Sequence, residues 1–204
     1  MPPKANSTAH DWWNDLRHHG ALISGPVLRE YFPSLDISGR YHTDKLRERF
    51  NSFDTWLAAG AGKQGRNEPL YRWIDGVLED FLYHPANRWA KGADIPADMT
   101  VAAITGDRIR PNRLFYRQIS KEKLLLAVMV ELPVPGREGY RELGAGKGRT
   151  TYGRLLEYLR GSGIKLGLLT NGLQFRLCYA SADTESRVEW DARAEFESSE
   201  LQEQ

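Results

Sequence analysis

Apolar residues in the first half of the chain recur at the three- and four-residue spacing of an α-helix. Spacing and capping residues predict one helix over residues 10–19, stopped by Gly20, and a second over residues 43–57. A third helix is expected over residues 69–83, where one wide apolar stripe consists of Leu70, Trp73, Ile74, Val77, Leu78, Phe81 and Leu82. Residues 1–92 are therefore predicted to be a helical region.

Beyond residue 92 the pattern changes to short apolar runs, which are typical of β-strands. A continuous apolar run over residues 124–130 indicates a strand that is buried on both faces. Thr150 or Thr151 is a suitable cap for a helix that ends near Arg160. The other expected strands cover residues 100–104, 114–116, 164–169, 173–179 and 188–190.

The order of these elements predicts a mixed fold of the α+β or α/β class. The helical region of residues 1–92 precedes a small mixed sheet with a packed helix over residues 93–192. Residues 193–204 are expected to be an acidic tail or linker. Asn171-Gly172 is the strongest hairpin signal in the chain, because a type I′ turn needs a positive φ at both central residues.

Composition excludes several classes of protein. Of the 204 residues 41% are apolar, which is enough for a hydrophobic core, and no stretch is long and apolar enough to span a membrane. The N-terminus lacks the apolar segment of a secretion signal. The single cysteine, Cys178, cannot form an internal disulfide and is expected to be a small core side chain. A reducing, cytoplasmic location is therefore expected.

The net charge of +1 hides a strong asymmetry along the chain. Residues 105–180 carry 14 Lys+Arg and 6 Asp+Glu, whereas residues 181–204 carry 2 Lys+Arg and 8 Asp+Glu. A basic segment attracts nucleic acid, although an arginine-rich surface is equally consistent with ordinary solvation. The acidic tail could cover the basic segment in cis.

Two glycine-rich stretches, residues 60–64 and 144–148, look like phosphate loops but lack the Ser or Thr that must follow the lysine. The second belongs to a stretch, residues 136–148, that is expected to be a mobile loop. His18-His19 has no further His or Cys at the spacing of a metal site. No adenosylmethionine-binding motif is present, so the chain itself is not expected to be a methyltransferase.

The segment from Arg149 to Leu177, with its Thr170-Asn171-Gly172 hairpin, resembles the N-terminal module of large restriction–modification and phage-defence DNA methyltransferases. These include the type IIG enzymes and the BREX and DISARM methylases, and the likeness covers about residues 70–197. Type I restriction subunits carry a similar hairpin after their nuclease strand. The resemblance implies DNA as a partner and a methyltransferase or another defence-system subunit as a second partner. A membrane is not expected as a partner, because the chain has no long apolar run.

The order of elements is also similar to the restriction-endonuclease-like core of PD-(D/E)xK nucleases. In these enzymes an Asp and a Glu hold Mg²⁺, and a Lys two residues after the Glu orients water. The resemblance places Asn112 at the Asp position, Glu131 at the Glu position and Pro133 at the Lys position. Asp107 is the nearest other carboxylate, and the cations that could replace the missing lysine are Lys147, Arg149 and Arg154.

Asn binds a cation more weakly than Asp, and Pro133 cannot replace a lysine. The resemblance therefore implies a degenerate nuclease fold, retained for DNA contact or scaffolding. The first alternative is an active Mg²⁺-dependent DNA endonuclease, with Glu131 and Asp107 as metal ligands and Asn112 and Lys147 beside them; Mg²⁺ is the one cofactor expected, and only in this case. The second alternative is a protein-interaction domain without a nucleic-acid role.

The residues expected to bind nucleic acid are Arg110, Arg113, Arg117, Lys147, Arg149 and Arg154. Each candidate has an ordinary structural interpretation as well. Glu131 could be a strand-end carboxylate that faces solvent, and the arginines before residue 120 could line a solvated sheet edge.

Overall fold

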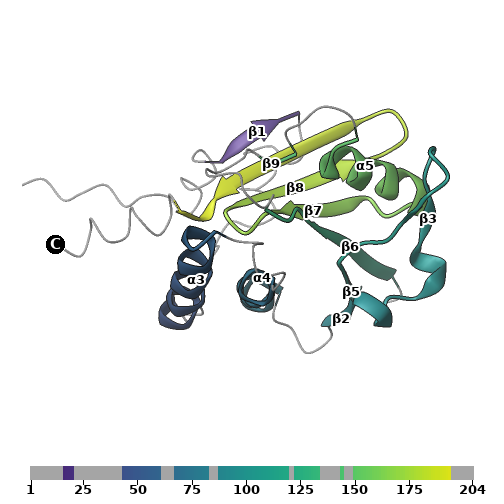
Figure 1. Ribbon diagram of the computed structural model, residues 1–204. Helices are drawn as coiled ribbons and strands as arrows, with labels where there is room; N and C mark the ends of the chain where they lie inside the picture. Colours follow the sequence, from purple (N-terminus) through teal and green to yellow (C-terminus); the bar gives the residue numbers. More distant parts are fainter. Residues whose placement is uncertain are drawn as a thin grey trace, which may run out of the picture.

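A seven-stranded sheet runs through the part of the protein that the computed structural model describes, which is residues 16–20, 43–60, 67–82, 87–119, 122–133, 143–144 and 149–193 (Figure 1). The strand order is β1-β9-β8-β7-β6-β5-β2, and every neighbouring pair is antiparallel except the parallel pair β6–β7. The strands are β1 (Arg17–His19), β2 (Asn87–Lys91), β5 (Arg113–Ile119), β6 (Glu122–Val130), β7 (Leu166–Thr170), β8 (Gln174–Ala180) and β9 (Glu185–Asp191). A separate hairpin consists of β3 (Val101–Ala102) and β4 (Arg108–Ile109).

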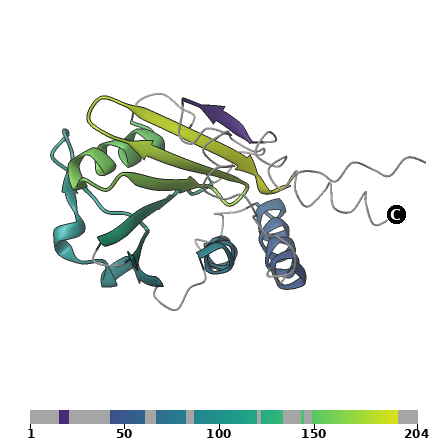
Figure 2. The same ribbon diagram turned by 180° about the vertical axis from the view of Figure 1, so that it is seen from behind.

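Helices cover both faces of this sheet, so the described fold belongs to the α+β class. Helices α3 (Thr43–Ala58) and α4 (Glu68–Leu82) lie together on one face, and α5 (Thr151–Ser162) lies on the other (Figures 1 and 2). Two short 3-10 helices, η1 (Gly92–Asp94) and η2 (Ala97–Met99), lead from β2 into the small hairpin. None of the described helices combines the length and the apolar character that a membrane span requires.

The two faces of the sheet have different cores. On the side of α3 and α4 the core is aromatic, with Phe53, Trp73 and Phe175 fully or almost fully buried. The rings of Phe175 and Trp190 stack with an interplanar angle of 9°. On the side of α5 the core is mostly aliphatic and includes Leu155, Leu159 and Cys178.

The turn between β7 and β8 joins the helical layer to the sheet. Gly172 has a φ of +92°, and a Cβ built on it would lie 2.6 Å from both Phe53 Cζ and Leu70 Cδ1. The indole N–H of Trp73 donates a hydrogen bond to the Gly172 carbonyl oxygen at 2.6 Å. Helices α3 and α4 therefore contact backbone at this turn, and only glycine leaves room for that contact.

The helices predicted over residues 43–57, 69–83 and 151–160 are confirmed as α3, α4 and α5, each within two residues at either end. Thr150 is the N-cap of α5, since its side chain accepts a hydrogen bond from Gly153 N at 3.1 Å. Strand β6 has buried residues on both faces, as the apolar run predicted. The strand expected at residues 188–190 is the longer β9.

Three details of the prediction are wrong. Residues 17–19, expected to end a helix, are strand β1 and pair with β9, and β2 also lies in the region that was expected to be helical. The register pairs Thr170 with Phe175, so the two central residues of the turn are Gly172 and Leu173 instead of Asn171 and Gly172. Asn171 instead accepts hydrogen bonds from Leu173 N and Gln174 N, while the Leu173 side chain is buried in the aromatic core.

Gly172→Ala is expected to lower the free energy of unfolding by more than about 2 kcal/mol, because it combines a left-handed φ with contact against the α3–α4 layer. Gly153→Ala is the matched control, since its Cβ would meet only Thr150 Oγ1 at 3.6 Å. That control should be neutral or stabilising by up to about 1 kcal/mol. Urea denaturation of both variants measures the difference, and equal effects would contradict this role of the turn.

Candidate functional site

Two of the expected active-site residues meet where β5 begins and β6 ends. Asn112 directly precedes β5 and Glu131 directly follows β6. Antiparallel pairing brings these strand ends together, and Asn112 N donates to Val128 O at 2.8 Å. Leu114 and Met129 face α5, and side chains two positions apart in a strand share a face, so Asn112 and Glu131 both lie on the α5 side.

Both residues already use polar atoms inside the protein. The side-chain oxygen of Asn112 accepts a hydrogen bond from Val130 N at 2.8 Å, which extends the β5–β6 ladder by one bond. Glu131 Oε2 accepts a hydrogen bond from Gly144 N at 3.1 Å. Pro133 stands where the resemblance would place the lysine and has no group that could hold a proton or a charge. Asn112 and Glu131 therefore act as hydrogen-bond acceptors for backbone at the strand ends.

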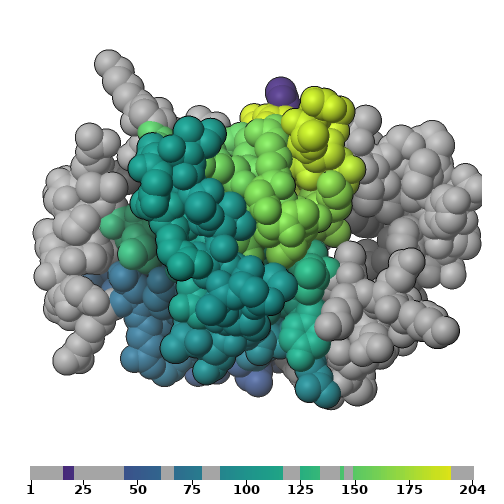
Figure 3. All heavy atoms as spheres, turned by 90° about the vertical axis from the view of Figure 1, so that its right-hand side faces the viewer, coloured from purple at the N-terminus to yellow at the C-terminus, as the bar shows by residue number. Residues whose placement is uncertain are grey.

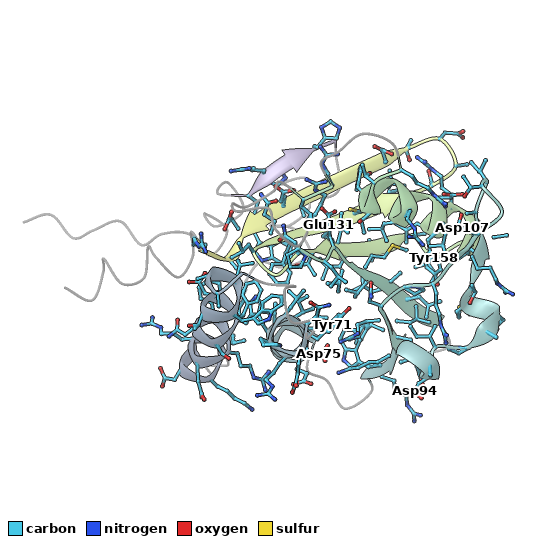
Figure 4. All side chains as sticks on the ribbon, in the orientation of Figure 1. Tyr71, Asp75, Asp94, Asp107, Glu131 and Tyr158 are labelled. Atoms are coloured by element: carbon cyan, nitrogen blue, oxygen red, sulfur yellow. The ribbon has the colours of Figure 1, made fainter. Side chains whose placement is uncertain are left out.

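Asp107 lies apart from Glu131 (Figure 4). It sits in the β3–β4 turn, where its carboxylate is 2.5 Å from an Arg149 nitrogen and 3.9 Å from an Arg154 nitrogen. Hydrogen bonds from the Thr105 hydroxyl and from Arg149 lower the pKa of Asp107 below its usual value. In the alternative of an active nuclease Asp107 and Glu131 would share one metal ion; in the structure Asp107 is paired with Arg149 and Arg154.

Within the described residues, no group of three or more His, Cys, Asp and Glu side chains is placed to hold a metal ion. Arg149, one of the cations expected to replace the missing lysine, bridges Asp107 and Glu157, with a distance of 2.6 Å to the latter. Arg154 is partly exposed and lies beside the Asp107 carboxylate. Lys147 and the side chain of Arg117 lie outside the described residues.

Arg113 has a structural position instead of the expected exposed one. Its guanidinium is buried on the α4 side, where Nε donates to Asp75 at 2.8 Å and Cζ lies 4.9 Å from the centre of the Tyr71 ring. Figure 4 labels Asp75 and Tyr71, which both belong to α4. A phosphate could reach this group only if the ion pair opened. Arg110 remains exposed, and its guanidinium donates to the carbonyl oxygens of Ala93 and Ile95. Carbonyl oxygens carry no net charge, so the positive charge of Arg110 is not neutralised by these bonds.

A buried polar cluster on the α5 side was not anticipated from the sequence. Arg176 in β8 pairs with Glu189 in β9 at 2.6 Å, and both side chains are less than 10% exposed. The Arg176 guanidinium lies 5.2 Å from the centre of the Tyr152 ring, and the neighbouring Gln174 accepts a hydrogen bond from Leu143 N at 2.7 Å. A usable signal was present in β9, where every second residue is charged, because side chains at alternate positions of a strand face one side of the sheet.

Cys178 lies on the same face of β8 as Arg176 and is fully buried, as expected from the sequence. Burial raises the pKa of its thiol to about 12, so the thiolate is not formed near neutral pH. Cys178 is therefore a core side chain without the properties of a nucleophile.

No protein-family profile matches the chain, and no significant match exists among curated proteins or solved structures.

Glu189→Ala is expected to cost about 3–5 kcal/mol of stability, because it leaves the Arg176 charge buried without its partner. The matched control is Glu68→Ala, which breaks a pair whose side chains are 73% and 67% exposed, and it should cost less than about 1 kcal/mol. Replacing both partners, as Arg176→Met with Glu189→Leu, should restore most of the loss. Urea denaturation of the three variants measures this, and an equal cost for both single variants would contradict it.

Asp75 should make the stability of the fold depend on pH. Burial alone would raise the pKa of this carboxyl, but hydrogen bonds from Arg113 and Lys91 outweigh burial and hold the pKa below 3.8. The ionised form therefore stabilises the folded state above about pH 4, and this contribution is lost as the pH falls toward the lower folded pKa. The gap in unfolding free energy between the wild type and Asp75→Asn should shrink below about pH 4. A gap that stays constant at acidic pH would contradict this assignment.

Proposed function

We propose that this chain is a nuclease-like module of a restriction–modification or phage-defence system that engages duplex DNA without cutting it. The observation that carries the proposal is the meeting of Asn112 and Glu131 at neighbouring strand ends, in a position that suits a metal site but with backbone groups already bound to both. The partners proposed are DNA and a methyltransferase or another subunit of the same system.

The topology supports a restriction-endonuclease-like core. Strands β5 and β6 are antiparallel neighbours, α5 crosses over one face, and β7 then pairs parallel to β6. Strand β8 follows through a tight turn. This is the strand, strand, helix, strand, hairpin order that the resemblance to PD-(D/E)xK nucleases implies. Ligands of mixed sheets with parallel strands bind outside the carboxyl ends of those strands, which is where Glu131 lies.

The chemistry of the site supports loss of cleavage. A metal-dependent nuclease needs carboxylates that share one ion and a cation that stabilises the developing charge. Asn112 is an amide whose oxygen accepts from Val130 N, and Pro133 carries no charge. Asp107 is paired with Arg149 and Arg154 instead of facing Glu131.

Charge supports contact with DNA. Arg113, Arg149 and Arg176 are paired with carboxylates. Arg108, Arg110 and Lys165 are exposed and form no ion pair with any residue that the structure describes. Phosphate contacts need such exposed cations, since each contact releases a counterion and makes binding sensitive to salt.

The wild-type protein is expected to bind duplex DNA at low ionic strength, with affinity that falls steeply between about 50 and 200 mM salt. It should leave supercoiled and linear DNA intact in the presence of Mg²⁺ or Mn²⁺. Glu131→Ala should bind as the wild type does, because Glu131 would hold no metal. Mobility shift and cleavage assays measure both properties.

Two results would overturn this proposal in different directions. Cleavage that needs Mg²⁺ and disappears in Glu131→Ala would make the chain an endonuclease. No DNA binding even at low salt would remove the nucleic-acid role and leave a protein-interaction domain.

A further inference from the structure

The β3–β4 hairpin presents the most exposed large apolar side chain of the described residues. Ile104, in the turn of this hairpin, is 96% exposed, whereas Leu132, the other large apolar side chain on the described surface, is 44% exposed. Figure 3 shows the residues around this hairpin, in teal, occupying much of one face of the protein beside α5 in green. An isolated apolar side chain on a surface needs no explanation by itself, so the inference depends on how this one is held and what surrounds it.

The turn that carries Ile104 is fixed by bonds to α5 and its flank. Ile104 N donates to Glu157 Oε1 at 2.5 Å. Arg149 donates to the Thr105 hydroxyl at 2.5 Å and pairs with Asp107 at 2.5 Å, and it also reaches Glu157. A short surface hairpin would otherwise be marginal in water, so these bonds hold the backbone of the turn that carries Ile104.

The base of the hairpin is also packed against α5. A Cβ built on Gly161 would lie 2.4 Å from Val101 Cγ1, so the helix and β3 are in close contact. The Tyr158 hydroxyl donates to Met99 O at 2.9 Å just before β3. The hairpin is therefore packed against α5, and χ1 of the β-branched Ile104 has fewer favourable rotamers than that of an unbranched side chain.

Two exposed arginines lie in or against the β3–β4 hairpin. Arg108 in β4 is exposed and forms no ion pair with any described residue. Arg154 in α5 has 43% of its side chain exposed and is 3.9 Å from Asp107, which leaves its guanidinium accessible. Arg108 and Arg110 together line a hollow formed with residues 93–97 and 100, next to the hairpin. Ile104 thus shares this part of the surface with two accessible cations, Arg108 and Arg154.

We infer that the β3–β4 hairpin inserts Ile104 as an apolar wedge into a groove of duplex DNA while Arg108 and Arg154 contact phosphates beside it. The inference rests on the proposed function and identifies the DNA-contacting element. A two-stranded ribbon fits a DNA groove, and Ile is among the side chains that enter between base steps. The cations around Ile104 favour a partner that carries phosphates over an apolar protein surface.

The two kinds of contact respond differently to salt, and this separates them experimentally. Ile104→Ala should weaken binding to duplex DNA about fivefold to tenfold with an unchanged slope of log Kd against log salt, because an apolar contact releases no counterion. Arg108→Ala should weaken binding and reduce that slope by about 1. The matched controls are Leu132→Ala and Arg72→Ala, on other elements, and both should bind as the wild type does. Fluorescence anisotropy with a labelled duplex at several salt concentrations measures all four variants.

Ile104→Met keeps an apolar side chain at the tip and should restore binding to within about twofold of the wild type. A duplex that carries 2-aminopurine should gain fluorescence on binding the wild type and not on binding Ile104→Ala, since a wedge unstacks bases. Urea denaturation of Ile104→Ala should match the wild type, because the side chain is 96% exposed. A weakened Ile104→Ala whose unfolding midpoint has also dropped, and whose binding Ile104→Met does not restore, would overturn the wedge.

Equal binding by Ile104→Ala, Leu132→Ala and the wild type would overturn the wedge and leave the DNA-binding proposal standing. A wild type that binds no DNA at low salt would overturn both. Retained DNA affinity in Ile104→Ala together with loss of binding to a purified protein subunit would assign the hairpin to a protein partner instead.

Discussion

Parallel pairing of β6 with β7 is the constraint on which the rest of the fold depends. Parallel neighbours cannot be joined by a tight turn, so the chain must cross over one face of the sheet, and α5 is that crossover. Once α5 covers one face, the opposite face is left to α3 and α4. The same pairing brings the carboxyl ends of β6 and β7 to one edge, where Glu131 N donates to Thr170 O at 2.8 Å. The candidate site and the turn at Gly172 therefore lie at the same edge because β6 and β7 are parallel.

The two faces of the sheet are stabilised by different interactions. The α3–α4 face gains its stability from interlocking aromatic rings, which bury large apolar areas in fixed geometry. On the α5 face, polar groups are bonded to one another, as in the Arg176–Glu189 pair within β8 and β9 and in the bonds from residues 143 and 144 to Gln174 and Glu131. Polar groups that are satisfied internally hold loops and strands in place and offer few free ligands. This arrangement is consistent with the proposed module, in which a nuclease framework persists and its chemistry does not.

Sequence patterns predicted the elements whose stability is local. Helix α5 was predicted closely because its cap at Thr150 and its apolar spacing lie within the helix itself. Strand β1 was not, because residues 17–19 owe their extended conformation to pairing with β9, about 170 positions away. Because Leu173 is buried under α3 and α4, the turn lies one residue further along the chain than the sequence pattern predicted. For the candidate site, sequence order placed Asn112 and Glu131 on adjoining strands but could not show that Asp107 pairs with Arg149.

The two edges of the described sheet have a consequence for how this protein behaves at high concentration. A sheet edge carries unpaired backbone groups that can template strand-by-strand association between copies. Here the edge strands are only three and five residues long, and β2 carries Arg88, which is exposed and forms no ion pair with a described residue. Two copies that approached edge to edge at β2 would bring their Arg88 side chains together over a short ladder with few hydrogen bonds to gain. The short edges that end the sheet therefore also disfavour its growth into a fibre.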